Sequence, residues 1–381
     1  MADRILTTHV GSLPRPAELL RRMRAQSAGE HSNAEAIADL LAQSVAEVVA
    51  RQVAAGIDIV SDGEFSKPSY AHYVSERLAG FSGSWKGSAA ADLKALPQFA
   101  QRQIEIGAVV PSAGGSCCVA DVERADSTAL ETDIANLRMA VAASRPAGAF
   151  LNAASPGIVL VFHRNEHYPS EDAYIEAVAE ALRPEYEAIA EAGFQVQIDA
   201  PDLAMSRHLT YSGLEDAGFL RIVERNVAVL NHATRNIAPE KMRMHVCWGN
   251  YSGPHNFDIA FEKIARAALS ARPQTILIEG ANPRHAHEWA VFEQVGLPED
   301  KMLVPGVIDS TSNYVEHPEL VAERLLRYAD VVGRDRLAAG SDCGFATFSE
   351  VPTVWPDIVW MKLQAMVEGA RIATDRLWRG S

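Results

Sequence analysis

A histidine and a cysteine stand two positions apart in the apolar run "MRMHVCWGN", residues 242–250. In a β-strand, residues i and i+2 point to the same face, so His245 and Cys247 can aim an imidazole and a thiol at one point. Imidazole and thiolate are both zinc ligands. The pair alone is weak evidence, because a free cysteine is among the most buried residue types and often only packs. A metal site needs further ligands from elsewhere in the chain.

The elements that could bring such ligands together are short apolar or β-branched runs separated by amphipathic helical segments. We predict eight strands, at 6–10, 57–61, 147–151, 195–199, 242–247, 275–279, 302–308 and 337–341. Helices are predicted between them, among them 33–56 (from Asn33 as N-cap), 171–193 and 317–333, each ending at a glycine. Eight strands alternating with helices are typical of parallel βα units, and eight strands close a barrel. We therefore predict an α/β fold of the (β/α)8 TIM-barrel type, with a doubly wound sheet as the alternative.

One stretch, 81–125, does not fit this alternation. Its first part, "FSGSWKGSAAADLKALPQFAQ", has the composition of a loop, and "IEIGAVVPSAGGSCCVADVE" is typical of a hairpin around Gly114–Gly115. We interpret about 82–125 as an insertion between barrel strands 2 and 3. The chain has no internal repeat, no low-complexity tract and no clear linker, so residues 1–381 are predicted to form a single domain.

Composition limits the classes of partner. The formal charge of −14 and the pI near 5.3 argue against nucleic acid or an anionic membrane surface as the main partner. Four cysteines in 381 residues do not make a disulfide framework. The start, "MADRILTTHVGS", is not a signal peptide, and no apolar run reaches membrane-spanning length, so we expect a cytoplasmic protein. The sequence carries no signal for the oligomeric state.

Polar residues gather where the predicted strands end, which in a (β/α)8 barrel is where active sites lie. A single acid at such a position often caps the following helix, but strand after strand ends this way here, which favours a catalytic face. These residues are Ser12, Asp62, Glu64, Asp199, His245, Cys247, Glu279, Asp309, Asp342 and Cys343.

Four of these residues, His245, Cys247, Glu279 and Cys343, are candidate zinc ligands. Two thiolates with a histidine and a carboxylate make a soft site, suited to holding another sulfur. A thiol bound to zinc loses its proton near neutral pH and stays nucleophilic, which predicts alkyl transfer to a thiol. Hydrolysis by zinc-activated water is an alternative, less favoured because two thiolates acidify water poorly, and a structural zinc is another.

The chain resembles the catalytic barrel of the cobalamin-independent methionine synthases, in a single-barrel form. The likeness is carried by "TTHVGSLPR", "IVSDGEFSKPSYAHYVSERLAGF", "QIDAPDLAM", "HVCWGN", "ILIEG", "PGVID" and "GSDCGF". It implies methyl transfer to homocysteine, forming methionine, with His245, Cys247, Glu279 and Cys343 as the ligands of Zn²⁺. It further implies that the backbone of Val10, Gly11 and Ser12 cradles the carboxylate of homocysteine, and that Glu64 and Asp199 hold its ammonium group.

The sequence departs from the family pattern on the side of the methyl donor. Full-length relatives carry a tryptophan after the third strand that stacks on the pterin, and 155–168 has none. Thr311 occupies the position of a histidine that assists proton delivery in those enzymes. The donor is therefore left open between methyltetrahydrofolate and a methylcorrinoid protein. His163 and Tyr70 are candidate proton donors, and Asp309 and Asp342 either bind substrate or orient the ligands.

Two other functions fit the same residues. An epoxyalkane:coenzyme M transferase would open a small epoxide with zinc-bound coenzyme M, and Arg15, Lys67 and Arg207 could then bind its sulfonate. A non-catalytic zinc- or thiol-binding barrel is the third hypothesis. The partners expected are thus a small-molecule thiol and an alkyl donor.

Overall fold

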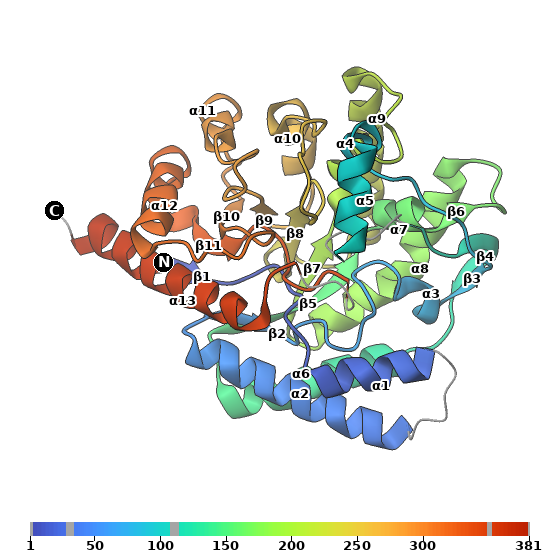
Figure 1. Ribbon diagram of the computed structural model, residues 1–381, viewed down its shortest axis with the longest axis horizontal. Helices are drawn as coiled ribbons and strands as arrows, with labels where there is room; N and C mark the ends of the chain where they lie inside the picture. Colours follow the sequence, from blue (N-terminus) through green and yellow to red (C-terminus); the bar gives the residue numbers. More distant parts are fainter. Residues whose placement is uncertain (1–2, 28–33, 107–113, 349–352, 380–381) are drawn as a thin grey trace.

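Eight parallel strands form a nearly closed barrel with helices on its outside (Figure 1). The computed structural model describes residues 3–27, 34–106, 114–348 and 353–379. The barrel strands are β1 (Leu6–Thr7), β2 (Ile59–Ser61), β5 (Gly148–Ala154), β7 (Gln195–Asp199), β8 (Met242–Val246), β9 (Thr275–Ile278), β10 (Met302–Ile308) and β11 (Ala338–Ser341). They follow the order β1-β11-β10-β9-β8-β7-β5-β2. The ends of this order meet where the Asp58 N–H donates to the Thr7 carbonyl (3.1 Å) and the Thr8 hydroxyl to the Ile59 carbonyl (2.9 Å).

The helices lie between successive barrel strands, as a right-handed βα path requires. Those of the barrel are α1 (Ala17–Ser27), α2 (Ala34–Ala54), α6 (Thr128–Ser144), α7 (Pro156–Phe162), α8 (Glu171–Glu191), α9 (Asp216–Ala233), α10 (Phe261–Leu269), α11 (Val291–Val295), α12 (Pro318–Val332) and α13 (Pro356–Thr374). The eight predicted strands and the TIM-barrel fold are confirmed, with bounds that differ by a few residues. Asn33, the predicted N-cap, lies outside the described residues.

Local sequence explains where these helices begin and end. The Ser170 hydroxyl accepts the Ala173 N–H (3.1 Å) at the start of α8, and His317 accepts the Glu319 N–H (3.2 Å) at the start of α12. After α8 and α12 the chain turns at Gly193 and Gly333. Their φ angles of 90° and 87° are readily adopted by glycine but not by residues with a Cβ atom.

The two faces of the barrel strands differ in chemistry. Val196, Met244 and Ile276 belong to the main apolar core between strands and helices. Arg243, by contrast, is 1% exposed, donates to the Thr8 hydroxyl (3.0 Å) and the His9 carbonyl (2.8 Å), and lies 3.9 Å above the Phe150 ring. A small, separate apolar cluster consists of Val10, Leu277, Val304 and Ala338. Polar groups inside the barrel thus lie beneath its carboxyl-terminal mouth, where they can support a site.

The segment between β2 and α6 contains a second, smaller sheet. Its elements are α3 (Val74–Arg77), β3 (Leu78–Ser82), α4 (Ala91–Ala95), α5 (Pro97–Glu105) and β4 (Cys117–Arg124), and β6 (Arg164–Asn165) completes the order β3-β4-β6. Two expectations were wrong here. The supposed loop contains α4 and α5, and β4 pairs antiparallel with β3, a strand that the predicted hairpin did not include. Residues 107–113, within the predicted hairpin, lie outside the described residues.

In the described part of the chain, no helix combines the length and the apolar character needed to cross a bilayer.

Candidate functional site

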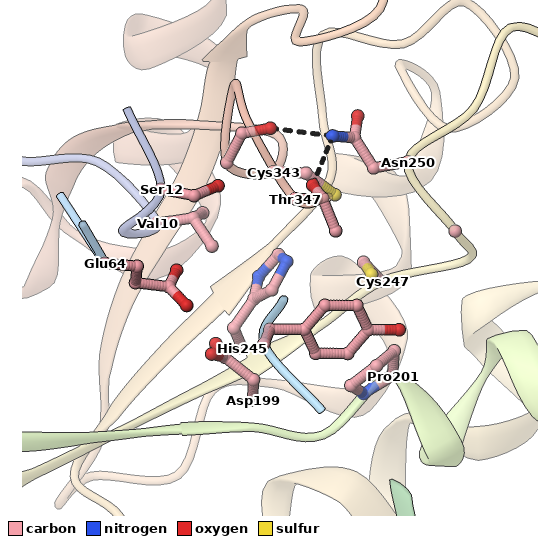
Figure 2. Close-up of a pocket in the computed structure, with 13 residues that line it drawn as sticks. Val10, Ser12, Glu64, Asp199, Pro201, His245, Cys247, Asn250, Cys343 and Thr347 are labelled. Carbon is pink, nitrogen blue, oxygen red and sulfur yellow. Dashed lines mark hydrogen bonds between the residues drawn. The ribbon is translucent and has the colours of Figure 1, made fainter. Parts of the chain in front are cut away.

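A pocket opens at the carboxyl-terminal ends of the barrel strands (Figure 2). It has a cavity volume of about 40 Å³, room for a few water molecules. Residues predicted from the sequence make up most of its wall: Val10, Ser12, Glu64, Tyr70, Asp199, His245, Cys247 and Cys343. The remaining wall was not predicted and consists of Pro201, Gly249, Asn250, Gly344 and Thr347.

Three potential metal ligands converge in this pocket. His245, at the end of β8, Cys247, just beyond it, and Cys343, after β11, each offer one ligand atom, and these atoms lie within 4.8 Å of one another. The three residues are 3%, 7% and 4% exposed. In Figure 2 the His245 imidazole lies between the carboxylates of Glu64 and Asp199 and the two sulfur atoms.

The electrostatics of the trio fit a thiophilic cation. Both ring nitrogens of His245 are buried without a hydrogen-bond partner, an arrangement that costs free energy unless something binds them. Burial, with a contribution from Arg243, lowers the pKa of His245 to about 3, so the ring is neutral and can act as a ligand. Burial and the neighbouring Cys247 raise the pKa of Cys343 far above that of a free thiol. A bound cation reverses this effect and favours the thiolate. Two sulfurs and one imidazole nitrogen are a zinc-type donor set.

Glu279, the fourth predicted ligand, lies at the edge of this group. Its Oε1 atom is 3.8 Å from Cys343 Sγ and accepts the Trp248 backbone N–H at 2.8 Å, and its Oε2 accepts the Asn282 amide at 3.3 Å. It is 3% exposed and follows β9 directly. The carboxylate is therefore held beside the Cys343 sulfur by the loops that follow β8 and β9.

Asp342 supports the position of Glu279 and does not line the pocket. Its carboxylate accepts the backbone N–H groups of Gly280 (2.8 Å), Ala281 (2.8 Å) and Asn282 (2.6 Å). These three donors begin the loop that follows Glu279. Asp342 thus ties the β9 loop to the β11 loop that carries Cys343.

A second group of residues places two carboxylates on the opposite side of the pocket. Asp199 is fixed by amide hydrogen bonds from Asn152 (2.9 Å) and Gln197 (2.9 Å). Glu64 adopts a left-handed backbone conformation, with φ of 58°, which is uncommon for a non-glycine residue and is found at functional sites. Burial raises the pKa of Glu64 to about 7, with a further contribution from Asp199, and burial raises that of Asp199 to about 6. The two carboxylates are therefore suited to a cationic ligand.

The chain after β1 contributes Val10 and Ser12 to the pocket wall, together with the potential metal ligands and the two carboxylates. The Val10 N–H donates to the Ser341 hydroxyl (3.3 Å), and the Val10 carbonyl accepts the Asn152 amide (2.9 Å). Gly11 does not line the pocket; a Cβ there would lie 2.5 Å from the Asn152 side chain, so the backbone requires glycine. The Ser12 hydroxyl accepts the Ala346 N–H at 3.3 Å.

Besides Asp342, two more of the proposed catalytic or supporting residues, His163 and Asp309, do not line the pocket. His163 is buried beside the small sheet, where its ring nitrogens contact the Ser116 hydroxyl (2.8 Å) and the Ala71 carbonyl (3.4 Å). Burial lowers its pKa to about 4. Asp309 accepts hydrogen bonds from the backbone (2.9 Å) and the hydroxyl (2.8 Å) of Thr311, which is a local turn contact. Tyr70 alone among the proposed proton donors lines the pocket.

Asn250 is a pocket residue that motif reasoning did not single out. Its amide donates to the Gly344 carbonyl and the Thr347 hydroxyl, both at 2.7 Å (Figure 2), and its oxygen accepts the Ser310 hydroxyl at 2.9 Å. One side chain therefore joins the loops after β8, β10 and β11. The only sequence signal was its place in "HVCWGN", three residues after Cys247.

Known proteins with similar sequences cover almost the whole chain. A methionine synthase of Saccharolobus solfataricus is 24% identical over 378 residues, covering 98% of this chain and 96% of the relative. One from Sulfurisphaera tokodaii is 23% identical over 374 residues, covering 97% and 93%.

Solved structures share the fold. A B12-independent methionine synthase from Shewanella sp. W3-18-1, in complex with selenomethionine, superposes with a TM-score of 0.76 at 20% identity over 99% of both chains. A putative vitamin-B12 independent methionine synthase from Listeria monocytogenes gives 0.65 at 18% identity over 97% of this chain and 98% of that one. The family model described as "Cobalamin-independent synthase, Catalytic domain" matches residues 5–98 and 104–371. The chain belongs to the cobalamin-independent synthase family, whose catalytic domain it comprises.

Proposed function

We propose that this protein is a zinc-dependent methyltransferase that methylates the thiol of homocysteine and forms methionine. One observation carries the proposal: a sulfur-rich metal-type ligand set and a pair of buried carboxylates share one small pocket. Homocysteine has a thiol at one end and an ammonium group at the other. The methionine synthases among the relatives support the same reaction.

Each end of the proposed substrate has its own residues. His245, Cys247, Glu279 and Cys343 would hold zinc, which when bound acts as a Lewis acid that lowers the pKa of a coordinated thiol. Glu64 and Asp199 would hold the ammonium group, because a buried cation needs anionic partners. The Val10–Ser12 backbone lies beside them and would receive the substrate carboxylate.

The methyl transfer itself needs a deprotonated sulfur, a defined position of that sulfur relative to the methyl carbon, and the exclusion of water. The homocysteine thiol gives up its proton, its sulfur forms a bond to the methyl carbon, and the bonding electron pair leaves with the donor. Burial, with a contribution from Cys247, raises the pKa of Tyr70 well above that of a free phenol, so this side chain stays protonated at the pocket wall. We propose that Tyr70 and Pro201 orient the sulfur and exclude water.

The cationic side chains near the pocket are already bound to other groups of the protein. This favours homocysteine over coenzyme M as the thiol substrate. The Arg15 guanidinium donates to the backbone carbonyls of Glu64 (2.5 Å) and Lys67 (2.7 Å), and the Lys67 ammonium donates to the Asn152 carbonyl (2.5 Å). Arg207 contacts the Tyr211 carbonyl (3.4 Å) and Asp216 (3.4 Å). In the described part of the chain, no lysine or arginine lines the pocket, so a sulfonate there would meet Glu64 and Asp199 in the pocket wall but no cationic side chain.

The test is methionine formation with each candidate donor. The zinc-loaded protein is incubated with L-homocysteine and either methyltetrahydrofolate or a methylcorrinoid, and methionine is quantified by mass spectrometry. Turnover with either donor supports the proposal and identifies the donor. Thiol binding without turnover on either donor would support the non-catalytic thiol-binding barrel, and conversion of coenzyme M with an epoxide would support the transferase alternative.

A further inference from the structure

A buried cluster of charged and titratable side chains lies behind the proposed metal ligands. Asp258, in the loop after β8, is 2% exposed at its side chain and contacts three histidines. Its Oδ2 atom is 2.9 Å from His255 Nδ1 and 3.0 Å from His285 Nε2, and its Oδ1 is 3.1 Å from His208 Nδ1 without hydrogen-bond geometry.

His285 differs from the other two histidines because both of its ring nitrogens face carboxylates. Nε2 contacts Asp258, and Nδ1 is 2.9 Å from Oε2 of Glu288. Ionised carboxylates only accept hydrogen bonds, so a ring that meets two of them donates from both nitrogens and is an imidazolium. Burial would lower the pKa of His285, but the hydrogen bonds to Asp258 and Glu288 outweigh burial and raise it to about 10.

The His285 ring stacks on the tryptophan that follows Cys247. The ring centroids of His285 and Trp248 are 4.0 Å apart, at an interplanar angle of 25°. Trp248 is fully buried, and its indole N–H donates to the Ile259 carbonyl at 2.7 Å, next to Asp258. A cation on the face of an indole is attracted by the ring quadrupole, more strongly when desolvated. The cluster therefore fixes the position of Trp248.

The backbone of Trp248 in turn orients Glu279. Its N–H donates at 2.8 Å to Glu279 Oε1, the same oxygen that lies 3.8 Å from Cys343 Sγ. Two thiolates and a carboxylate carry three negative charges against the two positive charges of zinc. The positive charge of His285, which interacts electrostatically with Glu279, compensates part of this excess.

We propose that His285 is a positioning residue for the metal centre: fixed by Asp258 and Glu288, it clamps Trp248 and so orients Glu279 toward Cys247 and Cys343. This inference rests on the proposed function, because it assumes that these residues hold zinc. It assigns a role to "NPRHAHE", residues 282–288, which lies outside the motifs of the family resemblance. Partners that orient metal ligands contribute about 10- to 100-fold to metal affinity in other sites.

Two variants test this role. His285→Gln removes both the charge and the stacking ring. Glu288→Gln is nearly isosteric: its oxygen can keep the 2.7 Å hydrogen bond from the Phe261 N–H, while its NH₂ group faces His285 Nδ1 and forces that nitrogen to accept. We therefore expect His285 to be neutral and the fold to be retained in Glu288→Gln. His232→Gln is the matched control, because His232 is exposed and pairs with Glu180 (2.7 Å) at the surface.

Zinc affinity is measured by competition with a chromophoric chelator, beside the Co²⁺ absorption spectrum and the thermal unfolding of the metal-free protein. We expect affinity to fall about 10- to 100-fold in His285→Gln and by less in Glu288→Gln, with shifted Co²⁺ bands in both and no change in the control. Wild-type affinity and spectra in both folded variants would overturn the inference alone. A wild-type protein that binds no zinc would overturn the proposed function as well.

Discussion

The Sγ atom of Cys343 lies 3.8 Å from Oε1 of Glu279, although the two residues are 64 positions apart in the sequence. The same carboxylate oxygen accepts the backbone N–H of Trp248. Glu279 therefore joins the loops that follow β8, β9 and β11 at one point. If these residues hold zinc as proposed, metal binding should depend on each of the three loops.

Replacement of Cys343 by serine should abolish zinc binding. The variant loses one of the two sulfur ligands and leaves a hydroxyl that binds zinc poorly at neutral pH. We expect stoichiometric zinc in the purified wild-type protein and almost none in Cys343→Ser, measured by plasma emission spectrometry. Cys117→Ser is the control, because Cys117 is also buried but lies in β4, away from the pocket. Equal zinc in Cys343→Ser and the wild type would contradict the proposed ligand set.

Replacement of Glu64 by glutamine should weaken homocysteine binding. Loss of one partner of a buried charge pair costs about 2 kcal/mol or more, which is about 30-fold in Kd. Titration calorimetry of the zinc-loaded variant measures this loss. 4-Mercaptobutanoate, which is homocysteine without its amine, should bind the variant and the wild type alike. Equal weakening for both thiols would mean that Glu64 acts on the pocket as a whole rather than on the ammonium group.

The same carboxyl gives a dependence of stability on pH in the metal-free, ligand-free protein. Its pKa is raised from 4.5 to about 7 by burial and by Asp199, so between these pH values the folded state holds a proton that the unfolded state has lost. The wild type should therefore lose stability as pH rises toward and through 7, by at most about 3 kcal/mol. Glu64→Gln has no such group. Thermal unfolding is measured at pH 5 and pH 8. The stability of the variant relative to the wild type should be greater at pH 8, and an equal difference at the two pH values would contradict the raised pKa.

A buried ion-pair group should anchor the segment between β2 and α6 to the barrel helices. The Arg77 guanidinium, on α3, is 3.2 Å from Glu185 of α8 and also pairs with Asp133 of α6. Arg77→Met would leave two buried carboxylates without a cation, and we expect a loss of about 3–5 kcal/mol in the free energy of unfolding in guanidinium. Arg371→Met, at an exposed pair with Glu368 (2.7 Å), should cost less than about 1 kcal/mol. Similar losses in the two variants would exclude an anchoring role.

The barrel strands could be predicted because each is a short apolar run with a turn or helix signal on either side. Residues such as Val196 and Ile198, facing the helices, alternate with Gln197 and Asp199 in the sequence itself. The small sheet could not be predicted in the same way. Its pairing of Leu78–Ser82 with Cys117–Arg124 is long-range, and local composition does not determine which strand pairs with which.

The spacing of residues in the sequence does not determine which of the strand-end residues face the pocket. His245 and Cys247 continue the alternation of β8, so their shared direction follows from period two. Asp309 follows a register shift between Gly306 and Ile308 in β10 and is turned toward Thr311. His163 follows α7 and packs with Phe81 of the small sheet, so its place depends on the insertion. Asn250 acts through side-chain bridges between loops, which no short motif encodes.

The most direct test of the central claim is calorimetric titration of the zinc-loaded protein with L-homocysteine, repeated in two buffers of different ionisation enthalpy so that released protons are counted. The proposed function predicts saturable binding with release of about one proton from the thiol, and no binding of coenzyme M in the parallel titration. Binding of coenzyme M without binding of homocysteine would contradict it. Glu64 and Asp199 would then not be an ammonium site, and the thiol substrate would be of another class.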